Sequence, residues 1–72
     1  MAELPLAPVE RIMRKIGLSE GVDRVSERAV QELRDELESI AVELSKKSAI
    51  YSKHAGRKTI THEDVRLARE QK

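Results

Sequence analysis

The amino-acid sequence predicts an all-α protein in which one long central helix lies between two short helices. No Gly or Pro occurs between Gly21 and Gly56. Within that stretch, apolar residues recur in steps of three, four and seven positions, at Val30, Leu33, Leu37, Ile40, Leu44 and Tyr51. This period is typical of an amphipathic helix, which we place at residues 26–54.

The predicted central helix is too long for its own chain to cover. At 1.5 Å per residue it measures roughly 43 Å, whereas a compact globule of 72 residues has a diameter of about 30 Å. A second apolar row widens its hydrophobic stripe, at Ala29, Ala41, Val42, Ala49 and Ile50. We infer an obligate partner, most simply a second copy. A plain antiparallel coiled coil is the alternative, but strict heptads fail at residues 46–48.

Composition excludes several classes of protein. Cysteine is absent and Tyr51 is the single aromatic residue, so disulfides, thiolate zinc sites and aromatic platforms for stacking bases are excluded. No apolar run is long enough for a membrane span, and the first residues do not resemble a signal peptide, so we expect a cytoplasmic protein. A chain with two histidines and no glycine-rich phosphate loop offers nothing from which to build an enzyme site.

Charge is segregated along the chain although the net charge is only +1. Residues 27–45 hold six acidic and two basic side chains, whereas residues 46–62 hold five basic and no acidic ones. A polyanion responds to the local field rather than to the total charge. The basic segment is therefore a candidate surface for a polyanionic partner.

The first short helix is predicted at residues 8–16, after an extended lead-in at residues 1–7. Pro8 suits a first turn, and Gly17 suits a C-terminal stop. Its polar face carries Arg11, Arg14 and Lys15. By spacing alone, that face reads as a solvated surface.

The remaining boundaries follow from capping residues. Residues 18–24 form a loop with Gly21, Ser26 is a good N-cap for the central helix, and Gly56 ends it. Residues 23–25 and 57–60 are compatible with short extended pieces. Thr61 followed by Asp64 resembles a capping box, and it opens a third helix at residues 61–70.

Several motifs in this order resemble the archaeal histones. They are Glu-Leu-Pro-Leu-Ala-Pro at 3–8, Arg-Ile at 11–12, Arg-Val-Ser at 24–26, His-Ala-Gly-Arg-Lys-Thr-Ile at 54–60, Glu-Asp at 63–64 and Leu-Ala at 67–68. The resemblance covers essentially the whole chain, as one histone-fold domain over residues 1–72. It implies a handshake dimer, in which each first loop pairs with the partner's second loop as a short parallel β-bridge.

The resemblance also implies binding to double-stranded DNA. Arg11 matches a family arginine that enters the minor groove, Arg24 matches a first-loop arginine, and Lys58 and Thr59 match second-loop phosphate contacts. Arg14 and Lys15 are further candidates for phosphate contacts. The expected activity is to bend and compact DNA into nucleosome-like complexes without strong sequence specificity, on the chromosome.

Other positions are assigned by the resemblance to structure and assembly. Arg57 is expected to pair with Asp64 inside one chain. A four-helix bundle between dimers is expected to use Tyr51, His54, Asp64 and Leu67. A metal site made by His54 and His62 is disfavoured because further ligands are lacking, and no cofactor or small-molecule substrate is expected.

The sequence departs from the family pattern at two places. Arg24 follows Gly17 by seven positions, where the family has three, so the first loop is longer by four residues. This is expected to alter the stacking of dimers into filaments. Tyr51 stands where the family commonly has leucine, which leaves the strength of tetramers open.

The main alternative is a protein-interaction role for the same fold. A histone fold can heterodimerise within a transcription or chromosome-segregation complex, and the acidic band of the central helix suits such a role. Retention of Arg11, Arg24, Lys58 and Thr59 favours DNA binding instead. The partner is expected to be a second copy or a paralogous histone, with tetramers and larger assemblies forming on DNA.

Overall fold

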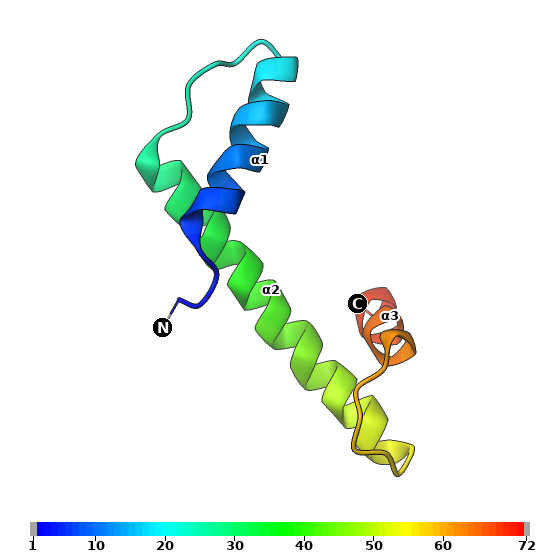
Figure 1. The fold of residues 1–72 in the computed structure, drawn as a ribbon. Helices are drawn as coiled ribbons and strands as arrows, with labels where there is room; N and C mark the ends of the chain where they lie inside the picture. The colour runs from blue at the N-terminus through cyan, green and yellow to red at the C-terminus, as the bar shows by residue number, and fades with distance from the viewer. Residues whose placement is uncertain (1, 72) are drawn as a thin grey trace. The chain divides into compact units, whose positions relative to one another are not determined.

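The computed structural model describes residues 2–71, which contain three helices and no strand. They are α1 (Leu6–Ser19), α2 (Glu27–His54) and α3 (His62–Glu70) (Figure 1). The all-α prediction is therefore confirmed. The chain divides into two compact units, one ending at Glu38 and the other beginning at Ser39, so the division falls within α2. That the two units form one domain remains a prediction.

Helix α1 is longer than predicted at both ends, because it runs from Leu6 to Ser19 rather than from 8 to 16. At its start, Pro5 occupies the N-cap position in an extended conformation and Pro8 is accommodated in the first turn. At its end, the N–H of Val22 donates to the carbonyl of Gly17 at 2.8 Å, and the N–H of Gly21 donates to Leu18 at 3.0 Å. With Gly21 at φ 82°, this is a Schellman motif.

Gly17 is thus a helical residue and not the predicted stop. The chain returns over it after the Schellman turn, and a Cβ added at Gly17 would lie 3.0 Å from the carbonyl oxygen of Val22. Glycine suits this position because of that close approach. Part of the extra length in the predicted first loop is therefore helix, and the connection between α1 and α2 is confined to residues 20–26.

Helix α2 ends at His54 as predicted and begins at Glu27, one residue later than predicted, because Ser26 is its cap. Ser26 caps it, since the Ser26 Oγ accepts from the N–H of Ala29 at 3.0 Å. Gly56 follows it at φ 72°. The N–H of Arg57 donates to the carbonyl of Ser52 and that of Gly56 donates to Lys53, both at 3.0 Å, which makes a second Schellman motif.

Helix α3 begins at the predicted capping box. The Thr61 hydroxyl accepts from the N–H of Asp64 at 3.4 Å, and the Asp64 carboxylate accepts from the N–H of Thr61 at 2.9 Å. The helix proper starts one residue later than predicted because Thr61 is its cap. It ends at Glu70, where Gln71 donates its N–H to the carbonyl of Leu67.

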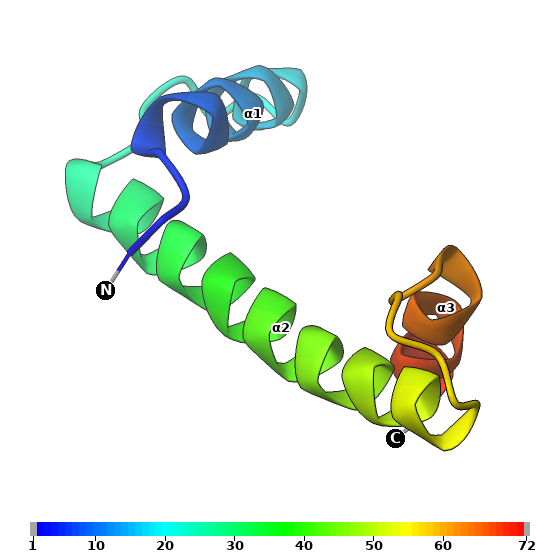
Figure 2. The same ribbon diagram turned by 60° about the horizontal axis from the view of Figure 1, so that its bottom comes forward.

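In the unit that ends at Glu38, α1 lies beside the first turns of α2 (Figures 1 and 2). Val9 and Val30 are its buried apolar side chains. The lead-in is fastened to α2 as well, since the N–H groups of Glu3 and Leu4 donate to the Glu38 carboxylate. These two bonds lower the pKa of Glu38, and Arg34 adds a favourable charge.

In the unit that begins at Ser39, α3 packs beside the last turns of α2 (Figures 1 and 2). Its buried residues are small or polar, namely Ser48, Ser52, Asp64 and Ala68. A core of this kind removes little apolar surface from water. Hydrogen bonds and the Arg57–Asp64 ion pair described below therefore fix the local conformation.

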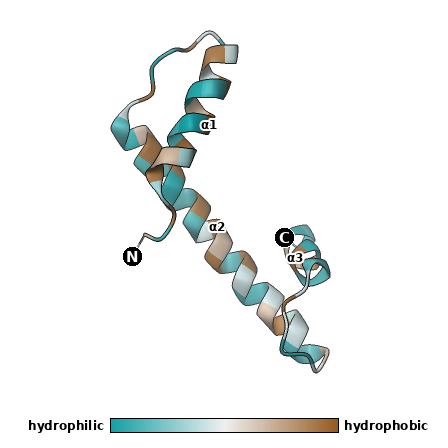
Figure 3. Ribbon diagram, in the orientation of Figure 1, coloured by the Kyte–Doolittle hydropathy of each residue, from teal (hydrophilic) through white to brown (hydrophobic). Residues whose placement is uncertain are grey.

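Large apolar side chains remain exposed throughout residues 2–71. Hydrophobic positions recur along α2 in Figure 3, but most are not covered. Twelve exposed large hydrophobic residues belong to the described part of the chain, at Leu4, Ile12, Ile16, Leu18, Val22, Leu37, Ile40, Val42, Ile50, Ile60, Val65 and Leu67. Within the described residues, no helix has the length and apolar character needed to cross a membrane.

Candidate nucleic-acid interface

The polar face of α1 presents the first group of predicted DNA contacts. Arg11, Arg14 and Lys15 lie three and four positions apart, so they share one side of the helix, and all three are exposed. Among residues 2–71, Arg11 and Lys15 take part in no ion pair. Both are therefore available to an anion.

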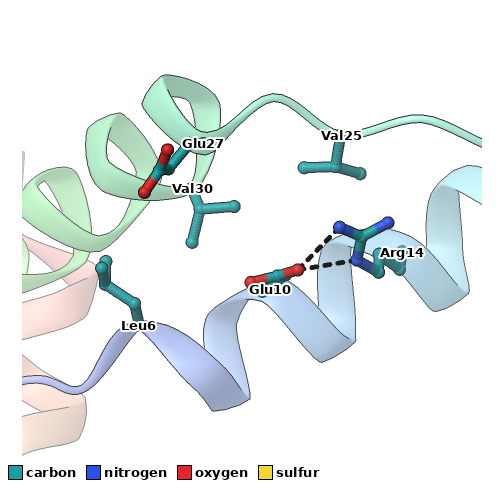
Figure 4. A pocket seen from close by; sticks show the side chains of 6 residues that line it. All are labelled: Leu6, Glu10, Arg14, Val25, Glu27 and Val30. Atoms are coloured by element: carbon teal, nitrogen blue, oxygen red, sulfur yellow. Dashed lines mark hydrogen bonds and ion pairs between the residues drawn. The ribbon is translucent and has the colours of Figure 1, made fainter.

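Arg14 is held differently from its neighbours. Its Nη2 lies 2.7 Å from Glu10 Oε2, and its Nε donates to the same oxygen at 2.8 Å (Figure 4). Both side chains are substantially exposed, so this pair is worth little and can be exchanged for another partner. Arg14 can still reach a phosphate, but only in competition with Glu10.

A hollow of about 320 Å³ lies beside this pair, between α1 and the start of α2. Its lining combines aliphatic side chains with two carboxylates and one guanidinium, from Leu6, Glu10, Arg14, Val25, Glu27 and Val30 (Figure 4). Two carboxylates against one arginine do not favour a phosphate. The anion-binding character of this unit therefore belongs to the exposed face of α1 and to Arg24, which is exposed in the connection of residues 20–26.

The second predicted group lies in the connection between α2 and α3. Lys58 and Thr59 are both exposed, while the backbone that carries them is held from beneath. The Thr59 carbonyl accepts from Ser52 Oγ at 2.8 Å and from Arg57 Nη1 at 3.0 Å. This segment thus presents a cation and a hydroxyl on an ordered backbone.

Arg57 and Asp64 form a bidentate ion pair within the chain. Arg57 Nη1 donates to Asp64 Oδ2 at 3.0 Å, and Nη2 donates to Oδ1 at 2.9 Å. Asp64 is 2% exposed. The arginine and the Thr61 N–H hold the pKa of Asp64 well below its usual range, and the same contact raises the pKa of Arg57.

The residues expected at the dimer–dimer interface all lie in the unit that begins at Ser39. His54 and Leu67 are exposed, Tyr51 is half-buried and Asp64 is buried. Tyr51 also lines a shallow apolar hollow of about 210 Å³ with Lys47, Ile50 and Gln71. Within residues 2–71, Asp64 Oδ1 accepts only from Arg57, so this oxygen has the capacity to accept one more hydrogen bond.

The two histidines lie on either side of the second connection, and both are exposed. The part of the chain that the structure describes has no group of three or more His, Cys, Asp or Glu side chains suited to a metal ion. Two imidazoles alone do not complete the four-ligand shell of a structural zinc site.

Two sets of hydrogen bonds were not predicted from the sequence. One is Glu38 with Arg34, which together hold the backbone of residues 3–4. The other is Ser52, buried on α2 beneath the second connection. Its signal was a serine at positions 48 and 52, in line with the apolar stripe, where an aliphatic residue is the usual choice.

These features define a class: an all-α chain with a long central helix, short flanking helices and an exposed cation on each connection, which is the histone fold. Residues 2–68 match the family "Histone-like transcription factor (CBF/NF-Y) and archaeal histone". The chain is 52% identical over 68 residues to one of the subunits of the archaeal histone HAN1 from Thermococcus zilligii, covering 94% of this chain and 96% of that protein. It is 48% identical to "Probable archaeal histone 3" of Methanocaldococcus jannaschii, with the same two coverages.

The chain therefore belongs to the archaeal histone and histone-like transcription factor family. Membership assigns it a histone-fold role in DNA packaging, associated with the chromosome. It also places the chain among structural proteins and not among enzymes.

Proposed function

We propose that this protein binds, bends and compacts double-stranded DNA as a dimer, with contacts mainly to phosphates. The observation that carries the proposal is the set of exposed cationic groups on α1 and on both connections, at the positions where archaeal histones are expected to contact DNA. Arg11, Arg24 and Lys58 are exposed in this way. Phosphate contacts position a protein on the duplex without reading sequence, so weak sequence preference follows.

A second copy of the chain is supported by the amount of surface left uncovered. The chain exposes 6294 Å², whereas a folded monomer of 8.2 kDa exposes roughly 4,500 Å². The difference is of the size that stable dimers bury per partner. Much of it is apolar, at positions such as Ile12 and Ile16 of α1 and Ile40 of α2.

In a handshake dimer, the first connection of one chain pairs with the second connection of its partner. Arg24 then lies beside the partner's Lys58 and the partner's Thr59. Each dimer gains two such edges, and the paired first helices add Arg11 from both chains. Three contact points along one curved face bend the duplex, and an arginine in the minor groove favours sequences that narrow easily.

Tetramers are proposed to form through Tyr51, His54, Asp64 and Leu67. The open position on Asp64 Oδ1 suits a donor such as His54 of a neighbouring dimer, while Leu67 and Tyr51 supply apolar contact. A phenol at position 51 can pack and also hydrogen-bond. The intrachain pair with Arg57 fixes the Asp64 carboxylate for this second role.

The salt dependence of DNA binding tests the proposal. Affinity for a duplex should fall steeply with salt because each phosphate contact releases counterions. Lys58→Ala should weaken binding to all sequences alike and lower the salt slope by about 1 per lost contact. Arg11→Ala should also weaken binding to every sequence, with a larger loss on sequences whose minor groove narrows easily. Arg69→Ala, which removes an exposed arginine outside the proposed surface, is the matched control.

A dimer that fails to bind DNA even at low salt would contradict the proposal. The fold would then serve as a protein-interaction module, and a heterodimeric partner would be the next subject of search. A loss of binding confined to one DNA sequence would contradict the phosphate-based account alone.

A further inference from the structure

We propose that Ser52 is a positioning residue for the DNA contacts of the second connection, and that it acts by fixing the backbone on both sides of Lys58. This inference rests on the proposed function, since it assigns the device that holds part of that surface. Ser52 does not itself reach DNA, because its side chain is buried.

The geometry around Ser52 Oγ carries the inference. The hydroxyl donates to the carbonyl of Thr59 at 2.8 Å, and the carbonyl of Arg57 lies 3.2 Å away. The carbonyl oxygens of Arg57 and Thr59, the residues on either side of Lys58, therefore both lie toward one buried hydroxyl. The Ser52 carbonyl also accepts the N–H of Arg57 at 3.0 Å, so a single residue of α2 holds the start and the end of this short segment.

A fixed backbone matters because Lys58 is itself a long and flexible side chain. Ordering a loop at the moment of binding subtracts from affinity, and a loop that is already ordered avoids that loss. Arg57 also donates to the Thr59 carbonyl, at 3.0 Å, but its guanidinium is partly exposed and engaged with Asp64. Ser52 is thus the buried anchor of the segment.

Ser48 provides a comparison inside the same helix. It lies one turn before Ser52 and is 0% exposed, but its Oγ has no hydrogen-bond partner among the described residues. Both serines are buried in α2. They differ in that only the Ser52 hydroxyl is hydrogen-bonded to the second connection. Ser48→Ala removes an unpaired buried hydroxyl, so it should leave stability equal or higher.

The test compares Ser52→Ala with Ser48→Ala in the full-length protein. Both substitutions place a good helix former in α2, so both variants should fold. DNA affinity is measured well below the thermal midpoint of either variant. Ser52→Ala should weaken binding to a mixed-sequence duplex by about threefold to tenfold, the loss expected for one hydrogen bond. Ser48→Ala should bind as the unaltered chain does.

Double variants separate positioning from general stability. If Ser52 acts through Lys58, Ser52→Ala should have little further effect in a Lys58→Ala background but its full effect in an Arg11→Ala background. Amide hydrogen exchange at residues 58–60 should rise in Ser52→Ala and not in Ser48→Ala.

Each outcome decides between the two claims. The role of Ser52 is overturned if the unaltered protein binds DNA and Ser52→Ala binds equally well. It is also overturned if Ser52→Ala lowers DNA affinity by the same factor in the Lys58→Ala and Arg11→Ala backgrounds. Either result leaves the proposed function standing. Failure of the unaltered dimer to bind DNA overturns both.

Discussion

At the scale of single residues, hydrogen bonds between buried polar groups stabilise regions that apolar packing usually stabilises in a core. Asp64 is 2% exposed, yet it accepts two hydrogen bonds from Arg57 and others from Thr61. A buried carboxylate is costly unless it is paired in this way. Its position is therefore tied to the geometry of both the second connection and the start of α3.

Asp64 should make stability depend on pH. Its pKa is lowered in the folded chain, so the folded state binds this proton less readily than the unfolded state does. The stabilisation is then fully present above the ordinary carboxyl pKa of about 4. It is lost as the pH falls below that value. The thermal midpoint of the unaltered protein should accordingly drop in acid.

Thermal unfolding from pH 7 to pH 2, at fixed salt and protein concentration, measures this effect. Asp64→Asn should lower the midpoint most at neutral pH, and its difference from the unaltered protein should shrink in acid. Asp35→Asn makes the same change of charge at an exposed site and serves as control. Parallel curves for Asp64→Asn and the unaltered protein would rule out the proposed linkage.

At the scale of elements, the helix ends were largely predictable because they depend on local residue chemistry. Ser26, Gly56 and the pair Thr61 and Asp64 act as caps where their residue types suggested. The end of α1 was predicted wrongly because two glycines compete for one stop signal. Gly21 takes the left-handed conformation, whereas Gly17 serves a close approach that only the folded chain reveals.

Gly21→Ala should destabilise the protein by about 1 kcal/mol per chain, the cost of the left-handed conformation for a residue with a Cβ. A Cβ at Gly21 would meet nothing within 4 Å, so backbone conformation alone sets this cost. Gly21→Asn should cost less, because asparagine tolerates this conformation. Chemical denaturation of the three proteins at one concentration checks the order, and equal stability of the Ala variant would disprove the assignment.

The exposed residues of the candidate site were predictable from the sequence, but the hydrogen bonds that hold its backbone were not. This difference has a physical cause. Exposed cations such as Arg11 and Lys58 are visible in a sequence because the motifs around them resemble archaeal histones. The hydrogen bonds that hold the neighbouring backbone join residues of different segments, as Glu38 joins Leu4 and Ser52 joins Thr59. No local pattern predicts the bond to Glu38, since a glutamate on a helix usually faces solvent. The position of Ser52 in the apolar stripe indicates a buried serine but does not indicate its partner.

At the scale of the whole molecule, the exposed apolar face of α1 is the clearest sign that the chain does not act alone. Ile12 is 62% exposed and Ile16 is 57% exposed. If a second copy covers them, Ile12→Glu should break the dimer. A symmetric dimer contains Ile12 twice, once in each chain. Losing the burial of both copies removes roughly 3–6 kcal/mol, which weakens dimerisation by about a hundredfold or more.

Sedimentation and circular dichroism across a dilution series measure this loss. Because the described chain buries few apolar residues by itself, dissociation should be accompanied by unfolding. Lys15→Glu changes an exposed residue three positions further along α1. It should leave the dimer folded while weakening DNA binding. An Ile12→Glu protein that remains a stable dimer would show that the partner contacts a different face.

The longer first connection bears on how dimers assemble along DNA. Its extra residues extend α1 to Ser19 and leave Leu18 and Val22 exposed beside the Schellman turn. From the resemblance to the archaeal histones, we expect Gly17 to lie where neighbouring turns of a DNA superhelix approach one another. The four extra residues, two of them helical, should therefore hinder stacking while leaving each dimer intact.

Deleting residues 18–21 tests this, because Gly17 then stands three positions before Arg24, as in the family pattern, and can cap a shortened α1. The deleted protein should bind a short duplex as before, since no proposed DNA contact is removed. On long DNA its complexes should sediment faster and protect longer nuclease-resistant fragments. Leu18→Ser with Val22→Ser, at full length, separates the effect of length from that of apolar surface. Equal compaction by the deleted and full-length proteins would mean that the longer connection lies clear of the stacking interface.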